Sequence, residues 1–354
     1  MARTAIARGV LLAVAAAVAF GVTTPVVAWA GRGAGAFTTA ALLYAGAAVI
    51  SLAMLAVARS RGAPIARGDL PRLLGVAIAG AAIAPALLAW GLQRAGATVG
   101  SLLLNLEAVF TVLLARAVFG EAIGRRVAVA VVAMVAGGVA IGLEMAGGGG
   151  SLGSLGGGLL GSLAVAAATL GWAIDNTLTR PLAERDPLYV VAAKAGLGVT
   201  FTLAAALIAG EPRPALGAAA ILLACGATGY GLSLRLYLLA QRTIGAGRTG
   251  SVFALAPFLG AAIAIAAGDR GATGWTLAAA ALFATGVYLH LTEHHDHAHV
   301  HEPIEHAHAH RHDDGHHDHV HDPPVAGEHT HAHHHGQLSH AHEHGADLHH
   351  SHSH

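Results

Sequence analysis

Ten apolar stretches of about twenty residues, separated by short polar or charged segments, fill the chain from residue 9 to residue 292. An apolar helix of about 20 residues crosses a hydrocarbon core of about 30 Å, and inside lipid its backbone bonds within its own segment. The apolar runs are continuous rather than alternating, which favours helices over barrel strands. The pattern therefore predicts an all-α polytopic membrane protein of about ten transmembrane helices, at residues 9–30, 38–57, 72–92, 96–117, 126–143, 158–179, 188–209, 215–240, 249–267 and 274–292.

The two halves of this apolar region resemble each other at an offset of about 150 residues. Matching pairs along the two copies are Gln93-Arg94 with Gln241-Arg242, Gly100-Ser101 with Gly250-Ser251, and Gly120-Glu121 with Gly268-Asp269. Five helices per copy is an odd number, so the second copy is expected to lie inverted in the membrane. Inverted repeats are typical of secondary transporters, whose substrate site lies near the midplane between the repeats. We therefore expect one five-helix repeat at 1–146, a flexible Gly/Ser linker at 147–157, and a second repeat at 158–292.

The composition changes abruptly at about residue 292. Before it, nineteen Lys and Arg accompany nine acids; after it come 25 of the 26 histidines, eleven acids and one further basic residue, Arg311. The formal net charge of zero thus combines a membrane part near +10 with a tail near −10 when histidine is neutral. The tail, 293–354, is therefore interpreted separately from the helices.

The distribution of arginine indicates the orientation. If the N-terminus is cytoplasmic, thirteen arginines lie in inner loops and only Arg32, Arg94, Arg213 and Arg270 lie in outer loops. Basic residues accumulate in cytoplasmic loops. Because an even number of spans returns the chain to its starting side, we expect a multi-pass protein of the inner (cell) membrane with both termini, and hence the tail, in the cytoplasm.

The fourth and ninth predicted helices contain the most specific motifs. The fourth contains Gly100–Phe110 (GSLLLNLEAVF) followed by Phe119-Gly120-Glu121, and the ninth contains Ser251–Phe258 (SVFALAPF). Residues 1 to about 292 resemble the EamA-type permeases of the drug/metabolite transporter superfamily, in which a Leu-Glu-Pro core precedes a Gly-Glu loop. This sequence has Ala108 where the first copy would have proline, and Ala256 where the second would have glutamate. The resemblance implies two five-helix bundles, alternating access, and export or exchange of small metabolites.

Charged groups inside a membrane are costly, which makes them candidates for function. Glu107, near the middle of the fourth helix, either binds a cationic group or a proton or is bonded to a neighbouring helix. Asp175 and Lys194 lie at similar depth in antiparallel helices, which predicts an ion pair with a structural rather than a substrate-binding role. Other candidates for the transport pathway are polar, aromatic or helix-kinking residues: Asn105, Asn176, Arg235, Pro25, Pro257, Trp90, Trp172 and Tyr230. Snorkelling of Arg235 and interfacial anchoring of the aromatic residues are the alternatives.

Histidines alternate with small or acidic residues along the tail. Imidazole and carboxylate ligands suit divalent Zn, Ni, Co or Cu, and the low apolar content predicts disorder. We expect the tail to bind divalent metal through interchangeable ligand sets; the alternative is a solvated extension that binds metal incidentally. The candidate ligands are His294, His295, Asp296, His297, His299, His301, His306, His308, His310, His316, His317, Asp318, His319, His331, His333, His334 and His335.

The favoured function is a secondary transporter, in our expectation an exporter, of a small metabolite or amino-acid-like solute, whose tail regulates transport or buffers metal. The alternative is a Zn, Ni or Co efflux carrier whose tail delivers the ion, although every histidine except His290 lies in the tail. A tethered metal sensor or store would not need ten helices.

No nucleotide-binding loop or hydrolytic triad is visible in the sequence, so we predict no enzyme activity and no cofactor for transport. The expected partners are membrane lipid, a small solute and divalent metal ions, with no nucleic acid. A homodimer is left open.

Overall fold

The computed structural model describes residues 2–57, 63–147, 152–182, 185–269, 273–292, 296–301, 304–310, 329–335 and 338–343. Within these residues, ten helices or groups of consecutive helices are long and apolar enough to cross a membrane. They are Ile6–Ala30, Ala36–Val57, Arg67–Ala95, Ala97–Phe119, Arg125–Ala146, Gly156–Leu182, Pro187–Ile208, Leu216–Gln241, Arg248–Ala266 and Gly274–Leu291. Their bounds agree with the predicted spans to within a few residues. The prediction of an all-α polytopic membrane protein is confirmed.

Several spans are built from more than one helical element. The first five spans contain α1 (Ala2–Gly21) and α2 (Thr23–Ala30); α3 (Ala36–Val57); η1 (Arg67–Asp69), α4 (Leu70–Val76), η2 (Ala77–Ile83) and α5 (Ala84–Ala95); α6 (Ala97–Leu103) and α7 (Leu106–Phe119); and α8 (Arg125–Gly147). The second five contain α9 (Leu152–Thr179) and η3 (Arg180–Leu182); α10 (Pro187–Ile208); α11 (Leu216–Cys225), η4 (Gly226–Leu232) and α12 (Ser233–Ile244); α13 (Ala246–Phe253) and α14 (Ala256–Ala266); and α15 (Gly274–Leu291).

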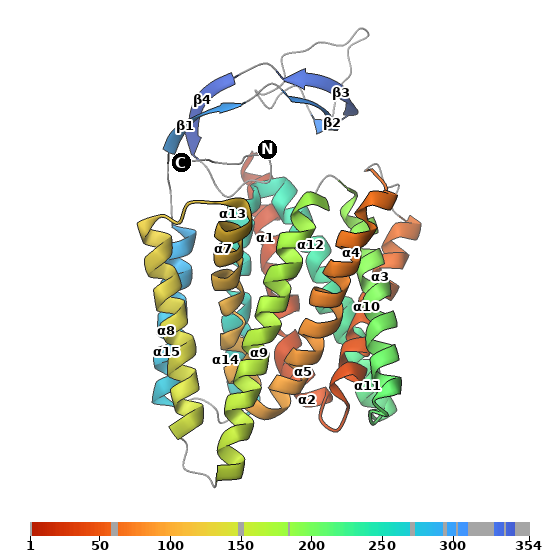
Figure 1. Cartoon of the computed structure of the whole chain (residues 1–354), viewed down its shortest axis with the longest axis vertical. Coiled ribbons are helices and arrows are strands. Elements are labelled where there is room, and N and C mark those ends of the chain that lie inside the picture. The colour runs from red at the N-terminus through yellow and green to blue at the C-terminus, as the bar shows by residue number, and fades with distance from the viewer. Residues whose placement is uncertain are drawn as a thin grey trace.

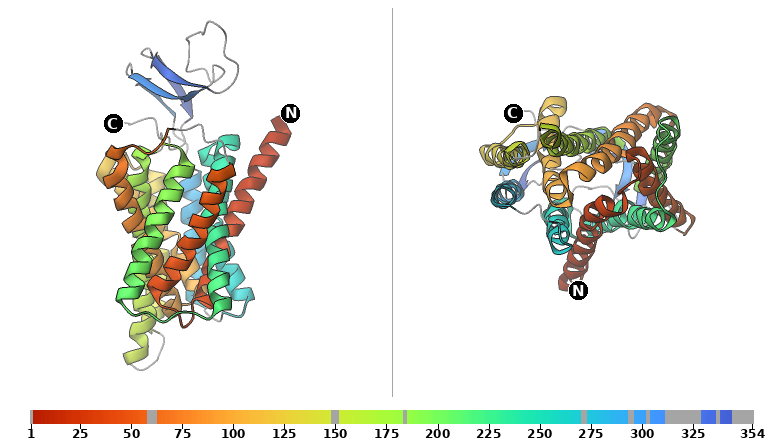
Figure 2. Two further views of the ribbon diagram at one scale, coloured as in Figure 1. Left: turned by 90° about the vertical axis from the view of Figure 1, so that its right-hand side faces the viewer. Right: turned by 90° about the horizontal axis from the view of Figure 1, so that it is seen from below.

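The helices form one bundle in which consecutive spans run in opposite directions (Figure 1). Figure 2 shows the helices standing side by side, from the side and from one end of the bundle. Because the number of spans is even, α1 begins and α15 ends at the same end of the bundle. We call this end the terminal side and the opposite end the far side.

The two halves share the same irregularities of the backbone. The π-helical segments η2 and η4 each contain seven residues and occupy equivalent places in the third and eighth spans. The fourth and ninth spans both follow a glycine with positive φ, Gly96 at 85° and Gly245 at 83°, and both break after a short first helix. Equivalent helices also pack against each other, α3 against α10 and α8 against α15. The halves are therefore an inverted repeat.

Small residues bring the two repeats into backbone contact. A Cβ on Gly46 of α3 would lie 1.9 Å from the carbonyl oxygen of Leu223, and a Cβ on Gly226 would lie 1.9 Å from that of Leu43. Only glycine allows helices this close, and close backbone packing is the main source of helix association in lipid. Here it fixes α3 against α11 and η4 beside the centre of the bundle.

Most of the segment 147–157, which was predicted to be a flexible linker, is helical. α8 extends to Gly147 and α9 begins at Leu152, while residues 148–151 lie outside the described residues. Once a helix exists, each further residue adds a hydrogen bond, so extension beyond the apolar boundary costs little even for a Gly/Ser sequence.

Four segments of the tail are extended and paired, where the sequence predicted disorder throughout. β1 (Asp296–His301) pairs antiparallel with β4 (Leu338–Glu343), and β2 (Ile304–His310) pairs antiparallel with β3 (His329–His335). The His-Ala-His pattern has the two-residue period of a strand, which is compatible with this pairing. Residues 311–328 and 344–354 lie outside the described part of the chain.

Candidate functional site

A cavity of about 520 Å³ lies between the two repeats. Its lining residues come from the middle or the terminal-side half of their spans, from Phe20 and Pro257 at mid-depth to Val191 and His290 about one turn from the terminal side. Small-molecule sites in proteins typically enclose about 300–1,000 Å³. The cavity therefore has the size and the midplane position expected of a solute site between inverted repeats.

The cavity is sealed on the far side. All seven residues of α6 are buried, and α6 packs against α14. A Cβ on Gly260 of α14 would lie 2.8 Å from the carbonyl oxygen of Gly21 and 2.9 Å from Ser101 Oγ. The helices α1, α6 and α14 therefore meet on the far side of the cavity. At the far end, the backbone N–H of Thr98 donates to Asp269 Oδ2 at 2.9 Å. The Asp269 carboxylate thus accepts a hydrogen bond from an N–H group that has no partner within the helix. Its negative charge also interacts favourably with the positive end of the α6 helix dipole.

The terminal side is more open, although it is built from equivalent segments. α13, the counterpart of α6, contributes Gly250 and Phe253 to the cavity wall, and its residues from 250 to 253 are half-buried. Glu121, the counterpart of Asp269, pairs with Arg180 at 2.5 Å. The guanidinium carbon of Arg180 lies 4.4 Å from the centroid of the Phe119 ring. The equivalent helices α6 and α13 thus differ: α6 closes the cavity at the far side, whereas the cavity is open beside α13 at the terminal side.

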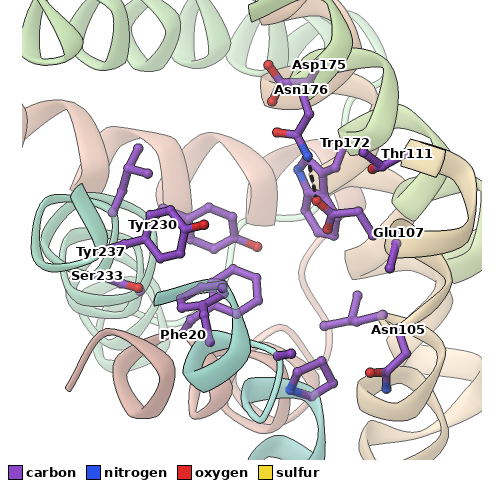
Figure 3. A pocket seen from close by; sticks show the side chains of 18 of the residues that line it. Phe20, Asn105, Glu107, Thr111, Trp172, Asp175, Asn176, Tyr230, Ser233 and Tyr237 are labelled. Carbon is purple, nitrogen blue, oxygen red and sulfur yellow. Dashed lines mark hydrogen bonds between the residues drawn. The ribbon is translucent and has the colours of Figure 1, made fainter. Parts of the chain in front are cut away.

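One wall of the cavity is polar (Figure 3). Asn176 Nδ2 on α9 donates a hydrogen bond of 2.8 Å to Glu107 Oε1 on α7. One turn of α9 deeper, Trp172 lines the same wall. Asp175 is buried, forms an ion pair with Lys194 of α10, and accepts a 3.2 Å hydrogen bond from Thr179 Oγ1. The ion pair that the matched depths predicted is therefore present beside the cavity.

The π-helical segment η2 supports this wall. Widening the turn frees the carbonyl of Gly80, which accepts hydrogen bonds from Tyr44 OH at 2.7 Å and Trp172 Nε1 at 3.1 Å. A Cβ on Gly80 would lie 2.1 Å from Asp175 Oδ2, so the absence of a side chain makes room for the carboxylate. The π segment thus positions two aromatic side chains and one acid of the site.

The opposite wall is aromatic, as the rings of Phe20, Tyr230 and Tyr237 in Figure 3 show. Phe20 of α1 lies 6.1 Å from Tyr230 and 5.4 Å from Phe253 between ring centroids. Tyr230 lies 5.6 Å from Tyr44, and Tyr237 lies 5.0 Å from Phe253. The five rings therefore form a continuous chain of contacts that crosses from the first repeat to the second.

The profile of the EamA-like transporter family matches residues 7–143 and 159–292, one segment in each repeat. The chain belongs to the EamA-like transporter family. Members of this family are transporters rather than enzymes, which agrees with a membrane bundle that encloses a solute-sized cavity.

Two further comparisons find a related transporter and a similar fold. An uncharacterized transporter from Methanothermobacter thermautotrophicus is 30% identical over 213 residues, covering 57% of this chain. The match spans 59% of that relative's own length. A protein of known crystal structure superposes with a TM-score of 0.56 at 20% identity, over 79% of this chain and 94% of the other. At that identity the likeness concerns the fold alone.

Most of the pathway residues predicted from sequence come together in this EamA-like fold. The cavity is lined by Asn105, Glu107, Trp172, Asp175, Asn176, Lys194, Tyr230 and Pro257. Three others lie elsewhere: Pro25 is buried in α2, Trp90 stacks under the Arg94 guanidinium at 3.6 Å, and Arg235 is exposed on α12. Depth along a span was predictable from sequence, but the face of the helix was not, because these helices are apolar all round.

The lining residues that were not predicted include six with polar or aromatic side chains: Phe20, Tyr44, Thr111, Ser233, Phe253 and His290. Single aromatic or hydroxyl side chains in an apolar span carry little signal by themselves. The one available signal was His290, the single histidine before the tail.

The predicted metal ligands are only partly within the described chain. His294, His295, His316, His317, Asp318 and His319 lie outside it, and the remaining candidates lie on β1, β2 and β3. In these strands the register sets His299 opposite His340 and His308 opposite His331. The described residues contain no group of three or more His, Cys, Asp or Glu arranged to hold a metal ion.

Proposed function

We propose that this EamA-like protein is a secondary transporter that exports a small metabolite or amino-acid-like solute across the inner membrane by alternating access. The observation that carries the proposal is the midplane cavity between inverted repeats, sealed by α6 on one side and open beside α13 on the other. Inverted repeats can exchange their conformations, which would close the open side and open the sealed one.

The arginine distribution is compatible with export. It assigns the terminal side, on which the cavity opens, to the cytoplasm. A solute would then enter from the cytoplasm between α7 and α13. Closing of α13 and separation of α6 from α14 would release it on the far side.

The tail is proposed to bind divalent metal and to regulate transport or buffer the ion. Support comes from the density of histidines in the sequence and from the cross-strand His partners in the described strands. The cavity favours an organic solute over a transported metal ion, since one wall consists of aromatic rings and the described residues contain no group of three or more His, Cys, Asp or Glu arranged to hold a metal ion.

The test is transport by purified protein in proteoliposomes, comparing the full chain with a truncation after Thr292. Both forms are assayed with an amino-acid and metabolite panel and with Zn²⁺, Ni²⁺ and Co²⁺. The proposal expects metabolite flux that survives truncation, with metal changing its rate only in the full chain. Metal flux that requires the tail, without metabolite flux, would replace it by the efflux-carrier function.

A further inference from the structure

The cavity lining contains two acidic side chains and one lysine. The acidic and basic side chains that line it are Glu107, Asp175, Lys194 and His290. Lys194 forms its ion pair with Asp175, which neutralises both groups. Glu107 instead receives a hydrogen bond from Asn176, whose amide is neutral. When Glu107 is ionised and His290 is neutral, the described lining carries one net negative charge, centred on Glu107.

The position of Glu107 makes this charge available to a ligand. Its α7 neighbours on the cavity wall, Ala108 and Thr111, are small, and Asn105 at the helix break bonds back to the carbonyl of Leu102 at 2.8 Å. A carboxylate at the membrane midplane is costly to keep and is stabilised by an opposite charge. A cationic ligand would supply that charge.

The aromatic wall adds a second recognition element for the same kind of ligand. Phe20 and Tyr230 lie across the cavity from Glu107 (Figure 3), and the Phe253 ring lies 5.4 Å from that of Phe20. These rings belong to a chain of ring contacts of 5.0–6.1 Å that also includes Tyr44 and Tyr237. Aromatic faces attract ammonium groups and also bind apolar or aromatic bodies through surface contact. An anion with the same body would gain the surface contact with the rings, but the carboxylate of Glu107 would repel its charge.

Resting on the proposed function, we propose that the transported solutes are organic cations: amines or quaternary ammonium compounds with an apolar or aromatic body. The ammonium group lies against Glu107, and the body lies against Phe20, Tyr230 and Phe253. Glu107 sets the preference for positive charge, and the rings set the preference for an apolar body.

The test uses ligands that share one aromatic body and differ in charge. Phenethylammonium and benzyltrimethylammonium are cations, phenylalanine is a zwitterion, and 3-phenylpropionate is an anion. Binding to the full-length protein in detergent is measured by isothermal titration calorimetry, and uptake is measured in proteoliposomes. We expect the cations to bind at least about tenfold more tightly than the anion, with the zwitterion in between.

Matched variants identify the groups responsible. Glu107→Gln should reduce the difference between cation and anion to about twofold or less, whereas Glu121→Gln, an acid outside the cavity lining, should leave it unchanged. Tyr230→Leu should weaken binding of the cations several-fold, and Tyr230→Phe, which keeps the ring, should not. Thermal unfolding of each variant shows whether it is folded.

The outcomes separate this proposal from the function on which it rests. Equal binding of the three charge types, preference for the anion or zwitterion, or an unchanged preference in Glu107→Gln overturns the organic-cation proposal. Flux of neutral or anionic metabolites without flux of the cations overturns it as well, while leaving the transporter function standing. Absence of flux for every solute tested would overturn both.

Discussion

The two ends of the bundle are built from equivalent parts of the two repeats, yet they are in different states. At the far side, α6 follows Gly96, is buried along its whole length, and has its N-terminus bonded by Asp269. At the terminal side, α13 follows Gly245 with the same backbone turn, but its residues 250 to 253 are half-buried beside the cavity. Glu121 follows a left-handed glycine, as Asp269 does, and forms an ion pair with Arg180.

This difference shows which parts of the fold are fixed and which are free to exchange. The π segments, the positive-φ glycines and the helix breaks recur in both repeats, so they are properties of the repeat itself. The contacts of α6 and α13 differ, so they belong to one conformation. Two nearly equivalent arrangements of one motif are the kind of bistable element that alternating access requires.

A cross-link across the seal should have the largest effect. A Cβ on Gly260 would lie 3.3 Å from Ser101 Cβ, close to the separation of about 3.8 Å in a disulfide. In a Cys225→Ala background, oxidation of Ser101→Cys/Gly260→Cys should abolish transport, and reduction should restore it. The single variants, treated with the same oxidant, serve as controls for packing. Transport that continues after complete cross-linking would show that α6 and α14 do not separate.

The next largest effect is on the free energy of unfolding, and it compares two residues that occupy equivalent places beside the two π segments. Gly80 faces the carboxylate of Asp175, whereas its counterpart Gly229 faces the hydroxyl of Thr23, 2.1 Å from a Cβ built there. Asp175→Asn should lower the free energy of unfolding by about 3 kcal/mol, because Lys194 is left partly buried without its partner. Thr23→Val should lower it by only about 1 kcal/mol, the value of one hydrogen bond.

Thermal unfolding in detergent measures both changes. The double variant Asp175→Asn/Lys194→Met should recover most of the stability lost in Asp175→Asn, since no unpaired charge remains. Equal losses for Asp175→Asn and Thr23→Val would mean that the ion pair contributes nothing beyond a neutral contact.

Removing the charge at the N-terminus of α6 should have a smaller effect, a shift in the equilibrium between the sealed and the far-side-open states. Asp269→Asn weakens the bond to the Thr98 N–H and its interaction with the helix dipole by ~1 kcal/mol, which favours the far-side-open state by about fivefold. The rate at which a membrane-impermeant maleimide labels Ser101→Cys from the far side reports this shift. Asp269→Glu is the control that keeps the charge, and an unchanged rate in Asp269→Asn would exclude a role in closure.

Glu121→Gln should have the smallest effect. Its ion pair with Arg180 is partly exposed, and pairs of this kind contribute ~1 kcal/mol or less. The rate at which maleimide labels Ser101→Cys should therefore stay within about twofold of the rate in the protein that keeps Glu121. An increase as large as that of Asp269→Asn would show that the two acids act alike in this conformation, contrary to their different contacts.

Much of the fold and part of the site were predictable from sequence. The apolar spans, the repeat offset and the matched depth of Asp175 and Lys194 are one-dimensional properties, and they specify which residues share a level in the membrane. The aromatic wall was predictable only in part: Tyr230 was a candidate, but Phe20, Tyr44 and Phe253 belong to three spans whose relative rotation is set by packing. For the same reason Arg235, at a suitable depth, lies on an exposed face.

The sequence by itself determined ten membrane helices, two related halves and the residues of mid-depth charge, because the length of an apolar run and the cost of a charge in lipid depend on local composition alone. Only the tertiary structure decided that the bundle is sealed by α6 and open beside α13. Both segments have the same local pattern, so which one is closed depends on contacts between helices far apart in the chain. In this structure α6 is closed by the packing of Gly260 against Gly21 and Ser101 and by the hydrogen bond from the Thr98 N–H to Asp269.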